Sequence, residues 1–283
     1  MKRLIITGDD FGLAVPVNEA IEMAHMEGVL AATSLMVGAD AVDDAIERAR
    51  RLPSLKVGLH IVLVEGRPVL PAESVPDLVD EHGQFRRGLV GAGIHFFFRP
   101  SVRRQIEAEI RAQFQSFQGT GLALDHVNAH NHMHLHPTVL NVIIKVGQAF
   151  GLNAVRIPYE PPLVSWRAAG LGLFPRILHT AALKPWTSIM QRRLRRAAIK
   201  TNDFVFGLND TGAMDERLLL RFLQQLPDGI TEIYFHPATR RCSEGDRTMS
   251  DYHREDELMA LISPRVKQLM DKLEIQPIAF SEI

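Results

Sequence analysis

The stretch "RLIITGDDFGLAVPVNEAIEMAHMEGVLAATSLMV", residues 3–37, contains the unit on which the fold prediction rests. An apolar run at 3–7 predicts a strand. Residues 15–28 have helical periodicity, with a proline in the first turn and a glycine at the end. A second apolar run at 30–37 predicts the next strand. Two strands joined through a helix form the unit of a parallel sheet.

The same alternation continues along the chain. Further helices are predicted at 40–52, 101–118, 137–150, 214–226 and 255–273, and further strands at 56–63, 122–129, 153–158, 203–206, 230–235 and 277–281. About eight such units favour an α/β fold of the distorted (β/α) TIM-like barrel type over an open doubly wound sheet. We expect a single domain over 1–283, with long excursions at about 64–99 and 160–202.

Composition limits the functional classes. The net charge of -1 gives no overall preference for nucleic acid, and none is expected as a partner. The single cysteine, Cys242, excludes an intramolecular disulfide framework and a cysteine-rich zinc site, which indicates a reducing setting. The N-terminal apolar run is too short for a signal peptide, and no stretch is long enough to span a membrane. We therefore expect a cytoplasmic protein, with peripheral contact at the inner membrane surface left open.

Polar side chains fall where predicted strands end. Asp9 and Asp10 follow the first strand, His60 lies late in the third, His130 ends the fourth, and His236 ends "ITEIYF". The C-terminal ends of barrel strands meet at one mouth, so these residues are expected to converge. One carboxylate beside two imidazoles suits a divalent metal, and the neighbouring carboxylate can take a proton from water.

Each of these residues also has a structural interpretation. Adjacent acids can cap a turn, as Asp9 and Asp10 would. His60 has apolar neighbours and fits a buried core histidine, while His236 can simply close its strand. The convergence of all of them at one mouth favours the functional interpretation, in which His236 becomes a candidate general acid.

The segment "HVNAHNHMHLHP", residues 126–137, contains five of the twelve histidines. Strand alternation places His126, Asn128 and His130 on one face. The later histidines His132, His134 and His136 then lie in the following loop, where lining or supporting the site is favoured over direct ligation. A surface histidine tract that binds metal adventitiously is the alternative.

The ordered set "DDFG", "GLHIVL", "HVNAHNHMHLHP" and a late "HPA" resembles the YdjC-like carbohydrate deacetylases, which include chitooligosaccharide deacetylase. The similarity covers nearly the whole chain. Phrases such as "SLMVGA", "RLPSLKVGLH" and "VRRQIEAEIRAQF" resemble most closely the hopanoid-biosynthesis-associated members of that family.

The resemblance implies a distorted barrel with an Asp-His-His metal site. Matched residue by residue, the metal ligands are Asp10, His60 and His130. Asp9 matches the catalytic base, and His236 matches the late "HP" element, whose role is less defined. One divalent ion is implied, with Zn²⁺ favoured and Mg²⁺, Mn²⁺ or Fe²⁺ compatible with the residue types.

The chain also departs from the wider family pattern HxDSHHHxH, because Asn128, Ala129 and Asn131 occupy three of its positions. The ligand position is kept, whereas the surroundings of the ligands and the choice of a soluble substrate are put in doubt. The residues expected to bind substrate or support the ligands are His132, His134, Arg156 and Asn128.

The resemblance implies hydrolytic removal of an N-acetyl group from an amino sugar, with the N-acetylglucosaminyl headgroup of a hopanoid lipid as the expected substrate. One alternative is a deacetylase of soluble chitooligosaccharide or another N-acetyl sugar. A second alternative, from another class, is a lipid-binding or metal-binding protein without turnover. The paired acids Asp9 and Asp10 argue against it, since metal storage does not require a spare carboxylate beside a ligand.

A strongly basic segment is hidden in this neutral chain. No Asp or Glu occurs between Glu160 and Asp203, while eight Lys or Arg residues and both tryptophans do. Basic residues among Trp and aliphatic side chains suit contact with anionic lipid. The alternative is a solvated helix paired with acids elsewhere, and a further apolar contact is expected from "HFFF" at 95–98.

Overall fold

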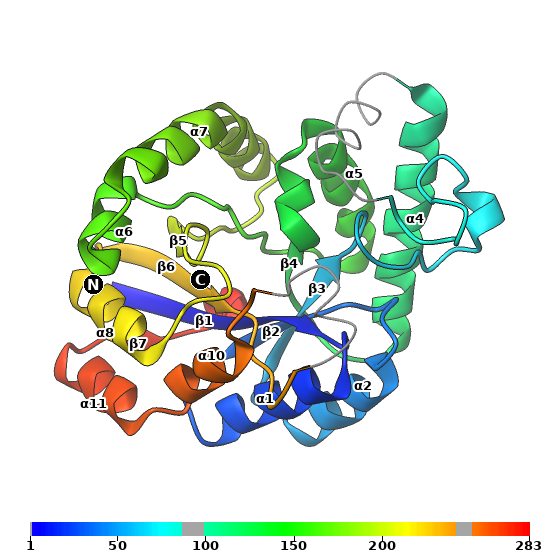
Figure 1. Ribbon diagram of the computed structural model, residues 1–283. Helices are drawn as coiled ribbons and strands as arrows, with labels where there is room; N and C mark the ends of the chain where they lie inside the picture. The colour runs from blue at the N-terminus through cyan, green and yellow to red at the C-terminus, as the bar shows by residue number, and fades with distance from the viewer. Residues whose placement is uncertain (1, 87–98, 242–250) are drawn as a thin grey trace.

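The computed structural model describes residues 2–86, 99–241 and 251–283, and its centre is a curled parallel sheet (Figure 1). The strands are ordered β4-β3-β2-β1-β6-β5, and a short β7 pairs with the first residues of β1. Their bounds are β1 Lys2–Phe11, β2 Ala32–Leu35, β3 Lys56–Ile61, β4 Leu124–Ala129, β5 Phe204–Phe206, β6 Gly229–Phe235 and β7 Gln276–Pro277. The sheet forms a half-barrel, so the predicted distorted (β/α) barrel is confirmed.

Helices surround the outside of this sheet. They are α1 Val15–Met26, α2 Val42–Arg51, α4 Pro100–Gly119, α5 Pro137–Gly147, α6 Pro162–Ala169, α7 Leu173–Arg196, α8 Glu216–Gln225, α10 Arg254–Leu261 and α11 Pro264–Lys272. Neighbours pack in the order α2, α1, α10, α8, α6, α7, α5, α4. Several begin with proline, whose fixed φ and missing N–H suit the first helical turn. None of the helices in the described ranges is long and apolar enough to cross a membrane.

The strand predicted at 153–158 is wrong. This stretch makes only isolated bridges, Val127 with Val155 and Ala154 with Lys200. A side chain replaces the missing ladder, because the Ile157 N–H donates to Asn202 Oδ1 at 2.7 Å and Asn202 Nδ2 donates to the Ile157 carbonyl at 2.9 Å. The sheet therefore has no regular strand between β4 and β5, only these bridges and the Asn202 side chain.

Other predicted boundaries also shift. The helix expected over 255–273 divides into α10 and α11, because Ser263 caps a new helix that starts at Pro264. The strand expected at 277–281 shrinks to β7, followed by a 3-10 turn at Phe280–Glu282. The excursion at 160–202 contains α6 and α7. The predicted "HFFF" contact at 95–98 lies outside the described residues.

Candidate active site

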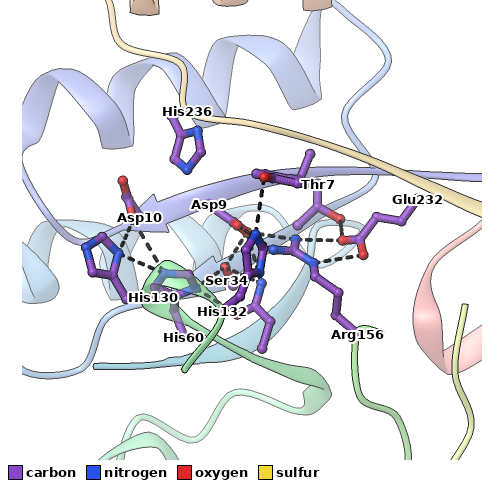
Figure 2. A network of polar contacts seen from close by, with 12 residues as sticks. Thr7, Asp9, Asp10, Ser34, His60, His130, His132, Arg156, Glu232 and His236 are labelled. Atoms are coloured by element: carbon purple, nitrogen blue, oxygen red, sulfur yellow. Dashed lines mark hydrogen bonds and ion pairs between the residues drawn. The ribbon is translucent and has the colours of Figure 1, made fainter. Parts of the chain in front are cut away.

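The end of β1 presents two neighbouring carboxylates to the same side. Consecutive side chains of a regular strand point to opposite faces. Here the pairing register with β2 shifts between Gly8 and Phe11, and Asp10 has a left-handed backbone with φ of 64°. As a result both Asp9 and Asp10 face the site (Figure 2). Left-handed backbone disfavours a residue with a Cβ, and such conformations cluster at functional sites.

Asp10, His60 and His130 bring three ligand atoms together. Asp10 Oδ1 lies 3.5 Å from His60 Nε2 and 3.4 Å from His130 Nδ1. The two ring nitrogens are 3.4 Å apart. A tetrahedral Zn²⁺ with ligands at about 2.0–2.1 Å would separate its ligand atoms by about 3.3–3.4 Å. The triangle therefore fits one face of a zinc tetrahedron, and all three residues are buried.

Asp10 has the electrostatic character of a metal ligand. Burial alone would raise the pKa of its carboxyl, but the adjacent His130 and His236 outweigh burial and hold that pKa far below its usual range. Neither carboxylate oxygen accepts a hydrogen bond from any described residue, and only Arg254 approaches Oδ2, at 3.8 Å. A buried anion without hydrogen bonds is costly, so this donor set fits a cation.

Asn128 fixes the orientation of the His60 ring. Its Oδ1 lies 2.7 Å from His60 Nδ1, so that ring nitrogen carries the proton and Nε2 keeps its lone pair toward Asp10. Its Nδ2 donates to Asp9 Oδ1 at 3.0 Å and to Ser34 Oγ at 3.2 Å. One amide thus connects a candidate ligand to a candidate base, which an aspartate at this position could not do because it has no N–H to donate.

Asp9 is held by a buried arginine. Arg156 NH1 donates to Asp9 Oδ2 at 2.6 Å and NH2 to Oδ1 at 3.0 Å. The same guanidinium binds Glu232, through Nε at 2.8 Å and NH2 at 2.7 Å. Burial alone would raise the pKa of Asp9, but the charge of Arg156 and its hydrogen bonds keep that pKa well below its ordinary value. Asp9 is therefore an anion in the resting protein.

The two oxygens of Asp9 are not equivalent. Oδ1 accepts hydrogen bonds from Ser34, Asn128 and Arg156, whereas Oδ2 accepts one, from Arg156. A carboxylate oxygen has two lone pairs, so only Oδ2 keeps one for a further donor. Asp9 lines the site cavity. Oδ2 is accordingly the atom of this residue that can take a proton.

A cavity of about 310 Å³ opens beside these groups. Asp9, His60, His130, His132 and His236 line it, together with Leu135, His179, Leu183, Leu208, Thr211, Tyr234 and Tyr252. Burial lowers the pKa of His236 to about 4, and no described residue makes a hydrogen bond to its Nδ1. This ring is neutral near pH 7, with a free nitrogen for hydrogen bonding.

The remaining predicted residues take different places. His132 lines the cavity, and its Nε2 is 3.2 Å from the Tyr234 hydroxyl. His134 lies behind the wall, with Nε2 3.1 Å from the Arg156 carbonyl, and burial lowers its pKa to about 3. His126 is far down β4, where it binds Asp125 and stacks on Phe280.

Several residues of this site had not been predicted. Ser34 in β2 contacts the candidate ligand His60, and Glu232 in β6 binds Arg156. The sequence signal for both was a buried polar residue in an apolar strand. Tyr234 packs its ring against the Arg156 guanidinium, 4.7 Å from the centroid. Tyr252 comes just before α10 and Arg254 is its first residue, and no pattern in the sequence indicated them.

A half-barrel whose polar groups gather at the carboxyl ends of its strands defines the class of barrel proteins that carry their site at this end. The model of the YdjC-like protein family matches residues 3–272, and the chain belongs to this family. A carbohydrate deacetylase of Brevibacillus brevis is 31% identical over 99% of both chains. A carbohydrate deacetylase of Mus musculus is 29% identical over 99% of this chain and 94% of its own.

A solved structure shows the same fold. It is a protein from Enterococcus faecalis V583, described as a proposed cellobiose-phosphate cleavage protein. The TM-score is 0.77 at 25% sequence identity, with 99% of this chain and 98% of that chain covered. The likeness extends over the whole sheet and its helices, which agrees with a curled half-barrel in this chain.

Proposed function

We propose that this protein is a carbohydrate deacetylase that hydrolyses the acetamide of an N-acetylated amino sugar with the help of one divalent metal ion. The observation that carries the proposal is the buried triangle of Asp10, His60 and His130 with the anionic Asp9 beside it. The relatives named as carbohydrate deacetylases support the reaction class. The 3.4–3.5 Å edges of the triangle favour Zn²⁺, since octahedral ions with ligands at about 2.0–2.1 Å need edges near 3.0 Å.

A bound divalent ion would polarise the acetamide carbonyl and make water more acidic. The chain supplies the proton transfers. Asp9 Oδ2 takes one proton from the attacking water, and Arg156 keeps that carboxylate ionised beforehand. The proton must finally reach the amine nitrogen as the C–N bond breaks. We assign this transfer to His236, which is neutral at rest and lines the same cavity.

The cavity wall suits the acyl group and the sugar. Leu135, Leu183 and Leu208 provide apolar surface for a methyl group and an apolar sugar face, and Tyr234 and Tyr252 add aromatic rings. A small cavity with apolar walls and a few polar groups is typical of small-molecule sites. The volume of about 310 Å³ accommodates one acetylated sugar ring more readily than a long chain.

The finer part of the proposal is the identity of the substrate. The sequence resemblance supports the N-acetylglucosaminyl headgroup of a hopanoid lipid as the substrate. The chain also departs from the wider family pattern at Asn128, Ala129 and Asn131, which argues against assuming the soluble substrate of other members. A soluble chitooligosaccharide is the competing substrate. Peripheral contact with the membrane that carries such a lipid belongs to the same proposal.

The test measures acetate release and bound metal together. Wild-type protein loaded with Zn²⁺ should release acetate from an N-acetylglucosaminyl hopanoid faster than from chitobiose. Asp9→Asn should keep the metal and lose turnover by at least about 100-fold, because the proton acceptor is gone. Asp10→Ala should lose both, while the exposed control Asp43→Asn should lose neither. Stoichiometric metal without acetate from either substrate would contradict the proposal.

A further inference from the structure

The outer face of α7 is apolar where a surface helix is normally polar. Phe174 and Leu178 are 75% and 61% exposed, and Ala181 and Pro185 continue the same line. The spacing of four, three and four residues places these side chains on one face of the helix. Leu171, just before the helix, is 68% exposed and extends the row. We call these five residues the α7 ridge.

The opposite face of α7 is anchored by polar contacts. Arg176 is buried and donates to both oxygens of Asp210, at 2.7 and 2.5 Å. It also donates to Ser165 Oγ, and Thr180 binds the Glu160 carbonyl at 3.0 Å. These contacts fix the rotation of the helix, so the exposure of the α7 ridge is a consequence of the fold.

Positive charge accompanies the ridge. Arg192 and Arg196 follow Pro185 by seven and eleven residues, so they lie on the same line of the helix. The exposed basic residues of the segment are Arg167, Lys184, Arg192, Arg195, Arg196 and Lys200. None of them forms an ion pair with a described residue, and 161–202 contains no acid. We call these six exposed basic residues the basic rim. Together, the α7 ridge and the basic rim complement an apolar surface that carries negative charge.

A basic recess lies at the C-terminal half of α7. It has a volume of about 390 Å³ and lies between α4, α5 and α7. Arg103, Arg104 and Arg193 line it, and its one acid, Glu107, is bound by Lys145 at 2.6 Å. Arg193 NH1 donates to the Pro137 carbonyl and to Asn141 Oδ1, both at 2.9 Å, so the recess adds a fixed positive charge beside the C-terminal half of α7.

The candidate active site opens beside the same helix. His179 and Leu183 of α7 line the cavity of the site from the inner side of the helix, where Leu183 is in line with the buried Arg176 and Met190. Figure 1 shows α7 along the outside of the fold, between α6 and α5. A surface in contact with the α7 ridge would therefore lie across this one helix from the cavity.

We propose that the α7 ridge and its basic rim dock on an anionic lipid bilayer and hold the helix that borders the cavity at the membrane surface. The presentation of a lipid-linked sugar to the cavity rests on the proposed function, whereas the docking does not. Nucleic acid is disfavoured because the ridge offers no hydrogen-bonding groups. A symmetric contact between two copies would bring together two basic segments that contain no acid to neutralise them.

The test is flotation of the whole protein with vesicles of phosphatidylcholine, alone or mixed with phosphatidylglycerol. Wild type should float with the mixed vesicles and only weakly with the neutral ones. Phe174→Ser combined with Leu178→Ser should weaken partition by about tenfold or more. Arg192→Gln combined with Arg196→Gln should weaken it by roughly 30-fold at low salt, from about 1 kcal/mol per basic residue.

Matched controls lie far from α7. Met26 and Met259 are 66% and 60% exposed, so their serine variants test exposed apolar area as such. Lys267→Gln with Lys272→Gln on α11 tests net charge. All four double variants should keep wild-type turnover on a water-soluble acetylated sugar.

Each outcome decides the proposal. Equal partition of the α7 variants and the controls would overturn it, as would equal binding to the two kinds of vesicle. If the wild type forms a dimer in light scattering that the α7 variants lose, and the wild type does not bind vesicles, the α7 ridge is a contact between two copies instead. Vesicle binding through the ridge without deacetylation of any acetylated sugar would leave docking intact and reject the proposed function.

Discussion

Arg156→Met removes the cation that holds two buried carboxylates. In the wild type the guanidinium makes four hydrogen bonds of 2.6 to 3.0 Å, two to Asp9 and two to Glu232. Arg156 is fully buried, and burial, which alone would lower its pKa, is outweighed by the two carboxylates. Removal of one partner from such a buried network costs about 3–5 kcal/mol, because the remaining charge is left unpaired. We expect a loss of this size in the free energy of unfolding.

Urea denaturation measures this loss from the shift in midpoint at constant slope. The double variant Arg156→Met with Glu232→Gln is the matched control, because it removes one stranded charge and leaves Glu232's partner Thr7 in place. It should be more stable than Arg156→Met alone. A cost below about 1 kcal/mol for Arg156→Met, typical of an exposed pair, would refute the assignment of a buried, charged network.

Three further predictions follow from the site. Asn128→Asp takes the hydrogen-bond donor from Asp9 and should lower metal affinity or turnover about 10–100-fold, measured by metal titration and acetate release; unchanged values would remove Asn128 from the site. Glu257 accepts a hydrogen bond from the His236 N–H, and burial raises the pKa of its carboxyl to about 7 from 4.5. Between these two values this carboxyl ionises only in the unfolded chain, so the free energy of unfolding falls as pH rises. Glu257→Gln should flatten that fall in denaturation at several pH values. Chelation should lower the Tm, and Zn²⁺ at about a thousand times its Kd should restore about 4 kcal/mol; an unaffected Tm would argue against a resident ion.

The positions of the triad residues could be predicted because strand ends are local signals. Asp10, His60 and His130 each follow an apolar run, and parallel strands bring such positions to one edge whatever the details of packing. The distance between them, in contrast, depends on the left-handed turn at Asp10, which no residue type announces. The convergence of these residues at one edge of the sheet could therefore be predicted, whereas the distances within the triangle could not.

The hydrogen-bond partners of Arg156 could not be predicted from the sequence, for a different reason. Arg156 was expected near the site, but its partner Glu232 lies 76 residues away in the middle of β6. Such a pair is visible only once the strands are in register. The strand predicted at 153–158 failed for a related reason, since its backbone pairs only at single bridges and the side chain of Asn202 takes both hydrogen bonds of Ile157.

The near-neutral net charge of the whole chain conceals the strong local charge of the basic segment at 161–202. Its charge was evident from the sequence, while the line of Phe174, Leu178 and Arg192 along one face was not assigned, because the segment had been treated as an excursion. Pro185 inside α7 also masks the helical pattern.

The most direct measurement is anomalous diffraction from crystals grown with Zn²⁺, recorded on both sides of the zinc absorption edge. We expect one anomalous peak at about 2.0–2.2 Å from Asp10 Oδ1, His60 Nε2 and His130 Nδ1, with a fourth direction open toward the cavity. The proposed metal site would be contradicted by a peak bound instead by His132, His134 or His136. It would also be contradicted by the absence of a peak between Asp10, His60 and His130.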